Sequence, residues 1–341
     1  MTFQITLTPS GRQFNCEADE SILSAALRSG FILPYGCKNG ACGSCKGQIQ
    51  SGTVVHGTHQ EKALSAGEEG QGGALFCCAK PQSDVTIVAR EILADEDYPL
   101  KKMPCRISKL EKLSDDVMLM ALQLPANENL KYRAGQYLEF LLKDGKRRSY
   151  SLASAPHLNE VTLHLRHMPG GVFTDQVFST LKERDILRFE GPQGSFYLRE
   201  DSDKPIILLA SGTGFAPIKA IVEHLIHLGS ERAVHLYWGG RRPQDLYMNS
   251  LCQEWAHSLP HLKYIPVLSD SLEEDQWQGR SGFVHRAVMQ DQPDLSAFQV
   301  YACGAPIVIE SAKRDFSEIC HLPADEFYAD AFISEADLVS P

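Results

Sequence analysis

Three cysteines stand close together near the start of the chain, and their spacing constrains the fold more than any other feature. Cys37 and Cys42 are separated by four residues, and Cys45 follows after two more. Three thiolates on one short C-x4-C-x2-C loop are typical of a [2Fe–2S] cluster site. Glycines in the loop supply the unusual backbone angles and the close approach that wrapping a cluster requires. They are Gly36, Gly40 and Gly43.

The fourth ligand must come from outside this loop, and two adjacent cysteines are the candidates. Only one of them can fill the remaining position, and we expect Cys77 to do so, with Cys78 as the alternative. A structural zinc site is disfavoured, because zinc sites favour paired short C-x2–4-C knuckles. The isolated cysteines fit the role of buried small hydrophobic residues. They are Cys16, Cys105, Cys252 and Cys320.

Composition and charge limit the classes of function. The 341 residues carry a net charge of -10, whereas a surface that binds nucleic acid needs an excess of lysine and arginine. No segment approaches the roughly 20 apolar residues of a membrane helix. The N-terminus lacks the basic and apolar regions of a secretory signal. We therefore expect a cytoplasmic protein with reduced thiols, a monomer or weak oligomer that binds neither nucleic acid nor membrane.

Residues 104–200 read as short strands separated by turn signals, which is typical of an antiparallel barrel. Arg148 and Tyr150 alternate on one of these strands, followed by Ser151. A guanidinium can bind a pyrophosphate through two hydrogen bonds, and a tyrosine ring can lie flat against an isoalloxazine. Further along, glycines precede a helix, and a helix N-terminus of this kind binds phosphate. That segment consists of Gly170, Gly171, Val172, Phe173 and Thr174.

After residue 205, apolar strands alternate with helical stretches, which is the pattern of a parallel sheet with helices on both faces. Gly212, Thr213 and Gly214 follow the first of these strands, where glycines let a backbone approach a pyrophosphate. Pro217 occupies the third glycine position of the dinucleotide fingerprint, and no acidic ribose anchor ends the second strand. The NAD-dehydrogenase type of nucleotide domain is therefore disfavoured.

These motifs resemble known modules. The cysteine loop resembles plant-type ferredoxins over residues 1–94. Arg147–Ser151, the glycine segment before the helix, and Gly191–Phe196 resemble the FAD domain of the ferredoxin–NADP reductase superfamily. Gly212–Pro217 and Tyr301–Gly304 resemble the nucleotide domain of that superfamily. We expect an α+β ferredoxin (β-grasp) domain over 1–94, a linker over 95–103, an FAD-binding β-barrel over 104–200 and a Rossmann-like α/β domain over 201–341.

The resemblance also implies roles for single residues. Arg148 binds the FAD pyrophosphate, Tyr150 stacks on the flavin ring, and Ser151 hydrogen-bonds near its reactive nitrogen. The segment Gly170–Thr174 holds the phosphates. Cys303 and Gly304 lie at the nicotinamide, so Cys303 flanks hydride transfer.

Two assignments concern the C-terminal aromatic and the choice of coenzyme. The resemblance places Phe332 near the other face of the flavin. Asp245, with the two residues after it, resembles NADH-using relatives. Arg241 and Arg242 could instead bind the 2′-phosphate of NADPH.

The three cofactors have complementary chemistry. Nicotinamide gives two electrons as hydride, a [2Fe–2S] cluster takes one, and flavin works in both regimes. The predicted path runs from NADH to FAD, to the cluster and then to a partner enzyme. Nearly the whole chain resembles the CDP-6-deoxy-Δ3,4-glucoseen reductases of deoxysugar biosynthesis, whose partner is a sugar dehydratase. Reductases of mono- and dioxygenases share this domain order and are the alternative. A [2Fe–2S] redox sensor is disfavoured, because a sensor needs no hydride-to-electron chain.

Overall fold

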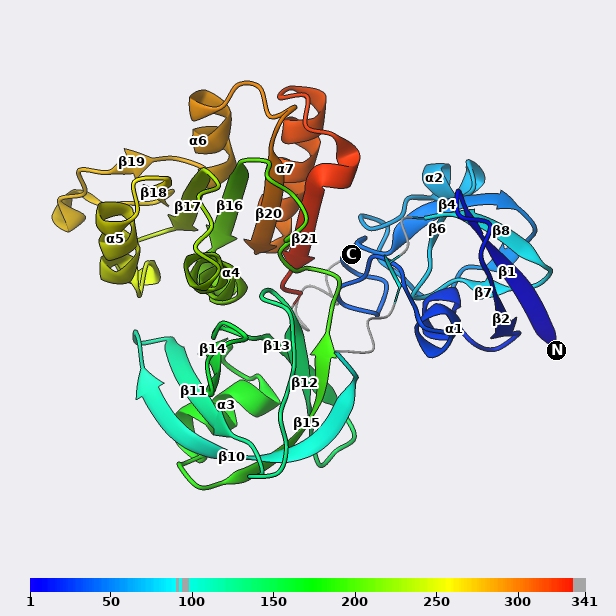
Figure 1. Cartoon of the computed structure of the whole chain (residues 1–341), viewed down its shortest axis with the longest axis horizontal. Helices are drawn as coiled ribbons and strands as arrows, with labels where there is room; N and C mark the ends of the chain where they lie inside the picture. The colour runs from blue at the N-terminus through cyan, green and yellow to red at the C-terminus, as the bar shows by residue number, and fades with distance from the viewer. Residues whose placement is uncertain (90–91, 94–97, 334–341) are drawn as a thin grey trace. The chain divides into compact units, whose positions relative to one another are not determined.

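The structure of the protein, a computed structural model, describes residues 1–89, 92–93 and 98–333. The chain divides into two compact units (Figure 1). The first comprises Met1–Tyr98 together with Ala331–Pro341, and the second comprises Pro99–Asp330. Within the described part of the chain, no helix has the length and apolarity needed to cross a membrane.

A five-stranded mixed sheet forms the first unit, with the strands in the order β2-β1-β8-β4-β6. The strands are β1 (Thr2–Thr8), β2 (Gln13–Glu17), β4 (Lys46–Ser51), β6 (Gly73–Leu75) and β8 (Val85–Val88). β1 pairs antiparallel with β2 and parallel with β8. Ile5 and Leu7 alternate into the core and are completely buried. Together with helix α1 (Ile22–Arg28), this sheet gives the predicted β-grasp fold.

Two short strand pairs and a short helix complete the first unit. They are β3 (Phe31–Ile32), β5 (Val54–Val55), β7 (Lys80–Pro81), β9 (Ile92–Leu93) and α2 (Ala66–Gly70). β3 pairs with β9, and β5 pairs with β7. A capping box begins α2, because Ser65 and Glu68 each accept a hydrogen bond from the backbone of the other.

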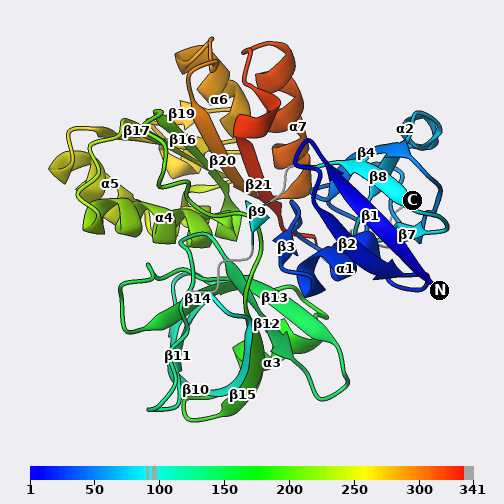
Figure 2. The ribbon, with the colours of Figure 1, turned by 45° about the vertical axis from the view of Figure 1, so that its right-hand side comes forward.

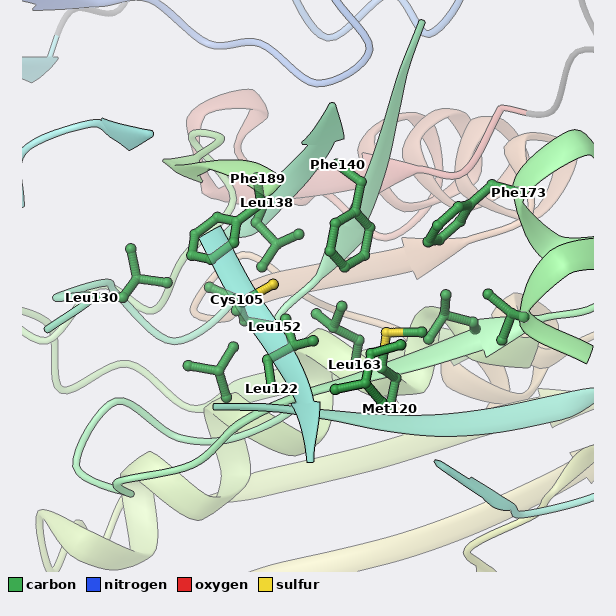
Figure 3. Close-up of a cluster of buried hydrophobic side chains, with 14 of the residues drawn as sticks. Cys105, Met120, Leu122, Leu130, Leu138, Phe140, Leu152, Leu163, Phe173 and Phe189 are labelled. Carbon is green, nitrogen blue, oxygen red and sulfur yellow. The ribbon is translucent and has the colours of Figure 1, made fainter. Parts of the chain in front are cut away.

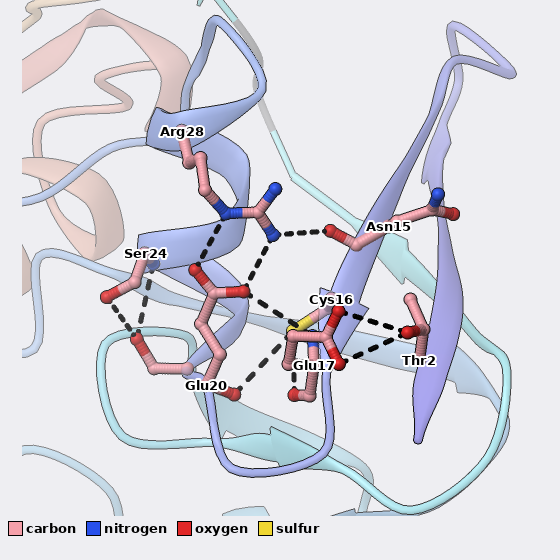
Figure 4. Close-up of polar contacts among 8 residues, drawn as sticks. Thr2, Asn15, Cys16, Glu17, Glu20, Ser24 and Arg28 are labelled. Atoms are coloured by element: carbon pink, nitrogen blue, oxygen red, sulfur yellow. Dashed lines mark hydrogen bonds and ion pairs between the residues drawn. The ribbon is translucent and has the colours of Figure 1, made fainter.

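Hydrogen bonds fix helix α1 at both ends (Figure 4). At its start, Ser21 Oγ accepts from the backbone N–H of Ser24 at 3.2 Å. At its end, Arg28 Nε and Nη2 donate to the two carboxylate oxygens of Glu20 at 3.1 and 2.7 Å. Arg28 Nη2 also donates to the carbonyl of Asn15 in β2 at 3.0 Å. The helix is therefore tied to the β1–β2 hairpin, and its first turn has a defined position.

Six antiparallel strands form a barrel in the second unit, in the order β13-β12-β15-β10-β11-β14. They are β10 (Lys101–Lys112), β11 (Val117–Gln123), β12 (Tyr137–Leu141), β13 (Arg147–Ser151), β14 (Val161–Arg166) and β15 (Ile186–Gln193). Leu152, directly after β13, bridges to Leu163 of β14 and closes the barrel. Helix α3 (Val172–Ser179) contributes Phe173 to the apolar core, where it meets Phe140 (Figure 3).

The start of β10 falls inside the segment 95–103 that the sequence suggests as a linker. Met103, Cys105 and Ile107 alternate into the barrel core, which identifies a strand in spite of its lysines and proline. Pro104 is accommodated because β10 pairs only with β15 at that position, and its pairing with β11 begins at Arg106. Residues 95–97 lie outside the described residues.

The rest of the second unit is a six-stranded sheet in the order β19-β18-β17-β16-β20-β21. The strands are β16 (Ile206–Ser211), β17 (Val234–Gly240), β18 (Leu262–Leu268), β19 (Arg280–Ser281), β20 (Gln299–Gly304) and β21 (Phe327–Ala331). The helices are α4 (Phe215–His227), α5 (Asn249–Ser258), α6 (Val284–Asp291) and α7 (Pro306–Glu318). Short 3-10 helices are η1 (Gly212–Gly214), η2 (Pro243–Asp245), η3 (Glu273–Asp275) and η4 (Ala324–Glu326).

The order of the strands locates the ligand-binding edge of this sheet. β16 pairs in parallel with β17 on one side and with β20 on the other. Helices α4 and α5 cover one face, and α6 and α7 cover the other (Figures 1 and 2). The chain thus leaves β16 in one direction and returns on its other side at β20, so the carboxyl ends of these strands form a topological switch point. The predicted Rossmann-like α/β architecture and antiparallel barrel are both confirmed.

Candidate functional site

Two of the predicted cluster ligands form a close pair on the cysteine loop. The backbone N–H of Cys37 donates to Cys42 Sγ at 3.4 Å, and the backbone N–H of Cys42 donates to Cys37 Sγ at the same distance. The backbone N–H of Ser44 also points at Cys42 Sγ, 3.5 Å away. The Cys42 thiol lowers the pKa of Cys37 to about 7. N–H groups aimed at sulfur are what a negatively charged thiolate needs.

The other two predicted ligands form a second pair. The Cys77 thiol donates a hydrogen bond to Cys45, and this bond is the main cause that raises the pKa of Cys77 to about 12. Cys78 Sγ lies 3.5 Å from Cys77 Sγ. Over the described residues, no three metal-binding side chains converge on a point for a single ion. Two pairs of thiols suit a two-iron cluster, in which four cysteines are shared between two metal ions.

The backbone around this site holds the two pairs in place. Gly40 has a φ of +78°, and a Cβ there would lie 2.8 Å from Cys78 Sγ and from His59 Cβ. The first turn of α1 donates its N–H groups to the carbonyls of Phe76 and Ala79, at 2.8 and 3.0 Å. These two carbonyls flank the Cys77 segment, so the anchored helix positions the fourth predicted ligand.

Strand β13 and the start of α3 come together at the edge of the barrel core. Tyr150 packs against Phe140 and Phe173, with ring centroids 6.0 and 5.6 Å apart. Arg148 and Tyr150 lie on the same side of β13, and Ser151 is buried on the opposite side. Burial raises the pKa of the Tyr150 hydroxyl, so this ring stays neutral. The predicted flavin-ring and phosphate residues are therefore neighbours in the fold.

The start of α3 has the form of a phosphate cradle. Gly171 is the N-cap and has no side chain to cap the helix, so the N–H groups of Val172 and Phe173 face its open end. A Cβ on Gly171 would lie 2.6 Å from Thr174 Oγ1. Thr174 Oγ1 donates to the carbonyl of Met168 at 3.0 Å, which fixes the preceding loop and Gly170 within it. The N–H groups at this helix end are donors of the kind that bind phosphate.

Two glycine loops interlock at the switch point of the parallel sheet. A Cβ on Gly214 would lie 2.1 Å from the carbonyl oxygen of Cys303. A Cβ on Gly304, whose φ is +133°, would lie 2.3 Å from the carbonyl oxygen of Ser211. Thr213 is buried between these loops and α4. Pro217 lies in the first turn of α4 as the sequence predicts.

Cys303 is completely buried at this point. Burial, together with the nearby carboxylate of Asp330, raises the pKa of the Cys303 thiol well above its usual value. The thiol therefore stays protonated and uncharged.

Asp245 has partners within the fold. Its carboxylate accepts hydrogen bonds from the backbone N–H groups of Arg241 and Arg242, at 2.7 and 3.1 Å. It also accepts from Arg166 Nη2 at 3.0 Å. Arg166 Nη1 lies 2.7 Å from where a Cβ on Gly212 would be, directly against the glycine loop. Arg166 is not among the site residues predicted from the sequence.

Phe332 follows β21 and is half-buried. It belongs to the first unit, whereas Arg148, Tyr150 and Ser151 belong to the second. Its predicted place beside the flavin stays a prediction.

Comparisons with known proteins match each part of the chain to a family. Residues 5–82 match the 2Fe-2S iron-sulfur cluster binding domain, residues 104–197 the oxidoreductase FAD-binding domain and residues 208–314 the oxidoreductase NAD-binding domain. The CDP-6-deoxy-L-threo-D-glycero-4-hexulose-3-dehydrase reductase of Yersinia pestis is 40% identical over 335 residues, covering 98% of this chain and 99% of that protein. The chain belongs to the iron–sulfur flavoprotein reductases.

Other members of this reductase family are named as the reductases of oxygenases. The terephthalate 1,2-dioxygenase reductase component 2 of Comamonas sp is 34% identical, over 97% of this chain and 98% of that protein. A crystal structure of an Amycolatopsis cytochrome P450 reductase, GcoB, matches with a TM-score of 0.77 and 33% identity, over 97% of this chain and 98% of that one. The predicted [2Fe–2S], FAD and NAD(H) cofactors are confirmed by these matches.

In this reductase, electrons pass from NAD(P)H to FAD and then to the [2Fe–2S] cluster. Bound FAD would supply the chemistry that links the two-electron hydride of nicotinamide to the one-electron [2Fe–2S] cluster. The residues described above supply binding and orientation. No acid–base constellation is needed for these steps, which fits the neutral Tyr150 and Cys303.

Proposed function

We propose that this reductase delivers its electrons to a sugar 3-dehydrase in the synthesis of a deoxysugar. The observation that carries this proposal is the 40% identity over nearly the full length of both chains to the 3-dehydrase reductase of Yersinia pestis. The terephthalate dioxygenase reductase is less similar, at 34% identity over a comparable length. The partner would be the CDP-6-deoxy-L-threo-D-glycero-4-hexulose-3-dehydrase for which the first relative is named.

We also propose the roles of the site residues. Four cysteines ligate the cluster in two pairs, Cys37 with Cys42 and Cys45 with Cys77, which is supported by their hydrogen bonds. Arg148, Tyr150, Ser151 and the cradle Gly170–Thr174 bind FAD, which is supported by their shared place at the barrel rim.

The interlocked glycine loops receive the dinucleotide in this proposal. Gly212, Thr213 and Gly214 face the pyrophosphate, with Pro217 holding the start of α4. Cys303 and Gly304 shape the nicotinamide position, and the uncharged thiol keeps that position apolar. For Phe332, the resemblance alone supports a place beside the flavin. Asp245 acts through Arg166 and the Arg241 backbone rather than by direct contact with the coenzyme.

Service to an oxygenase is the alternative function, supported by the full-length similarity to the terephthalate 1,2-dioxygenase reductase. A coupled assay separates the two. The holoprotein is supplied with NADH, and candidate partners are added one at a time while NADH oxidation and product are measured. Turnover with the sugar 3-dehydrase supports the proposal, and turnover with an oxygenase alone would overturn it.

The proposal also covers the cellular location and the oligomeric state of the reductase. NADH is generated in the cytoplasm, so we place the reductase and its partner there. We propose a monomer or weak oligomer, because one chain carries all three predicted cofactor sites.

A further inference from the structure

At the end of strand β17, the parallel sheet can contact the adenosine ribose of a dinucleotide. In doubly wound sheets, an acidic residue at this strand end bonds the ribose 2′-hydroxyl, whereas an arginine nearby accommodates a 2′-phosphate. Here the strand ends at Gly240 and continues into Arg241 and Arg242. Two arginines at this position would by themselves favour NADPH.

The guanidinium of Arg242 is already engaged by two carboxylates from η3. Arg242 Nε and Nη2 donate to the two oxygens of Asp275 at 2.6 and 2.7 Å. Arg242 Nη2 also donates to Glu274 Oε1 at 2.8 Å. A bidentate arginine–carboxylate pair is among the strongest charge-assisted arrangements. The same hydrogen bonds lower the pKa of Asp275, so its carboxylate is ionised at neutral pH.

The segment that carries these carboxylates is held against the strand end by its backbone. The N–H of Ser269 donates to the carbonyl of Gly240 at 2.9 Å, and the N–H of Asp270 donates to the carbonyl of Arg241 at 3.1 Å. Within the segment, the backbone N–H of Leu272 donates to Asp275 Oδ2 at 2.8 Å. The side chain of Asp275 is only 9% exposed. We call the ion pairs of Arg242 with Asp275 and Glu274 the Arg242 lock. These ion pairs are part of the folded edge of the sheet and are not an incidental surface contact.

Charge at this edge also opposes a further phosphate. Arg241 remains 75% exposed and is the one arginine of the pair that faces solvent. Its Nε lies 4.0 Å from Asp245 Oδ2. Four further acidic residues follow on the segment after β18, namely Asp270, Glu273, Glu274 and Asp275. A 2′-phosphate would bring its charge next to this group, and like charges at a binding surface weaken binding.

We propose that Asp275 and Glu274 are positioning residues that hold Arg242 away from the coenzyme, so that the site selects a nicotinamide nucleotide without a 2′-phosphate. The inference rests on the function given above, in which a nicotinamide nucleotide is the electron donor. It adds the residues that choose between NADH and NADPH, and they act through Arg242.

The double variant Asp275→Asn/Glu274→Gln in the FAD- and cluster-loaded protein tests this proposal. It should raise kcat/KM for NADPH about tenfold while kcat/KM for NADH changes less than about twofold. Binding gives a second readout, because the affinity for 2′,5′-ADP should rise by a similar factor while that for 5′-ADP stays constant. Adding Arg242→Gln to the double variant should remove both gains.

Matched variants keep the outcomes distinct. Glu273→Gln removes one charge from the same segment without touching Arg242, and it should leave the NADPH/NADH ratio unchanged. Glu274→Gln alone, at an exposed position, guards against misfolding of the double variant. An unchanged ratio and unchanged 2′,5′-ADP affinity in the double variant would overturn the proposal, as would an equal gain from Glu273→Gln. Failure of the wild type to oxidise either nucleotide would instead refute the proposed function, and the 2′,5′-ADP titration would still test the lock.

Discussion

At the scale of single residues, neighbouring positions in the cluster site have different surroundings. Cys77 is hydrogen-bonded to Cys45, and its segment is fixed by the bonds from α1 to Phe76 and Ala79. Cys78 instead packs its sulfur beside Gly40 of the cysteine loop. The sequence offered both cysteines and favoured Cys77, and the way α1 holds the chain gives a physical reason for that choice.

Cys77→Ser should therefore abolish the cluster, whereas Cys78→Ser should retain it. Serine is nearly isosteric, so the backbone contacts survive and only the thiolate ligand is lost. The measurement is the visible absorbance of the purified protein together with its iron content. A retained cluster in Cys77→Ser with loss in Cys78→Ser would reverse the assignment.

Gly40→Ala should prevent cluster assembly, because its Cβ would collide with Cys78, His59 and the Thr58 carbonyl. Gly11→Ala is the matched control: Gly11 has a similar φ of +73°, but a Cβ there meets nothing within 4 Å. The control should lose only about 1–2 kcal/mol, the cost of a left-handed residue. Cluster absorbance and thermal unfolding of both variants provide the readout, and equal effects would contradict the packing argument.

At the scale of elements, periodicity in the sequence locates most of the second unit correctly. β14 lies in the segment 104–200 that the sequence predicts to be strand-rich, and β16 begins the alternation of strands and helices predicted after residue 205. β10 was not predicted, because its proline and lysines resemble a linker and its inward positions are visible only once β15 is beside it. Long-range contacts could not be predicted either. Two of them are the contact of Arg166 with Gly212 and the ion pair of Arg242 with Asp275. Each joins residues far apart in the chain, and no local sequence pattern indicates it.

The interlocked loops at the switch point predict a selective defect. Gly304→Ala should weaken NADH binding at least about tenfold, because relieving the contact with Ser211 displaces the loop. FAD content should be unchanged, since β13 and α3 are untouched. Gly282→Ala serves as the control, because Gly282 also has a positive φ, +113°, but open space around its Cβ. Rapid-mixing kinetics of flavin reduction over a range of NADH concentrations distinguish the two, and unaltered NADH affinity in Gly304→Ala would contradict the prediction.

His164 on β14 gives the second unit a pH dependence. It is buried, with Nδ1 3.0 Å from the Tyr247 hydroxyl, and burial lowers the pKa of His164 to about 3. Between pH 6.5 and about 3, the unfolded chain therefore binds a proton that the folded unit does not, so stability falls as the pH falls. His164→Gln should flatten this slope, whereas replacing the exposed His257 by Gln should not.

Tryptophan fluorescence is a suitable probe of that slope, because all three tryptophans lie in the second unit. They are Trp238, Trp255 and Trp277. Urea unfolding at several pH values gives the free energy of unfolding for each variant. Identical slopes for wild type and His164→Gln would show that His164 is not responsible.

At the scale of the whole molecule, the sequence was informative because each cofactor is bound by a local motif. The cysteine loop, the strand with Arg148 and Tyr150, and the glycine loop after β16 each occupy a short stretch of chain. Physical constraints on a small set of residues therefore reveal the cofactors. The acceptor is chosen by an exposed surface made from many segments, and no short motif encodes such a surface.

The order of electron flow is the central claim, and a comparison of the wild type with Cys42→Ser tests it most directly. Both proteins, loaded with FAD, are mixed with NADH in the absence of oxygen. Flavin absorbance measures reduction of the flavin, and electron paramagnetic resonance then measures reduction of the cluster. The wild type should reduce its flavin and then its cluster. Cys42→Ser should reduce its flavin at the same rate, show no reduced-cluster signal and fail to drive the partner enzyme. Loss of flavin reduction in Cys42→Ser, or undiminished electron delivery to the partner, would contradict the account.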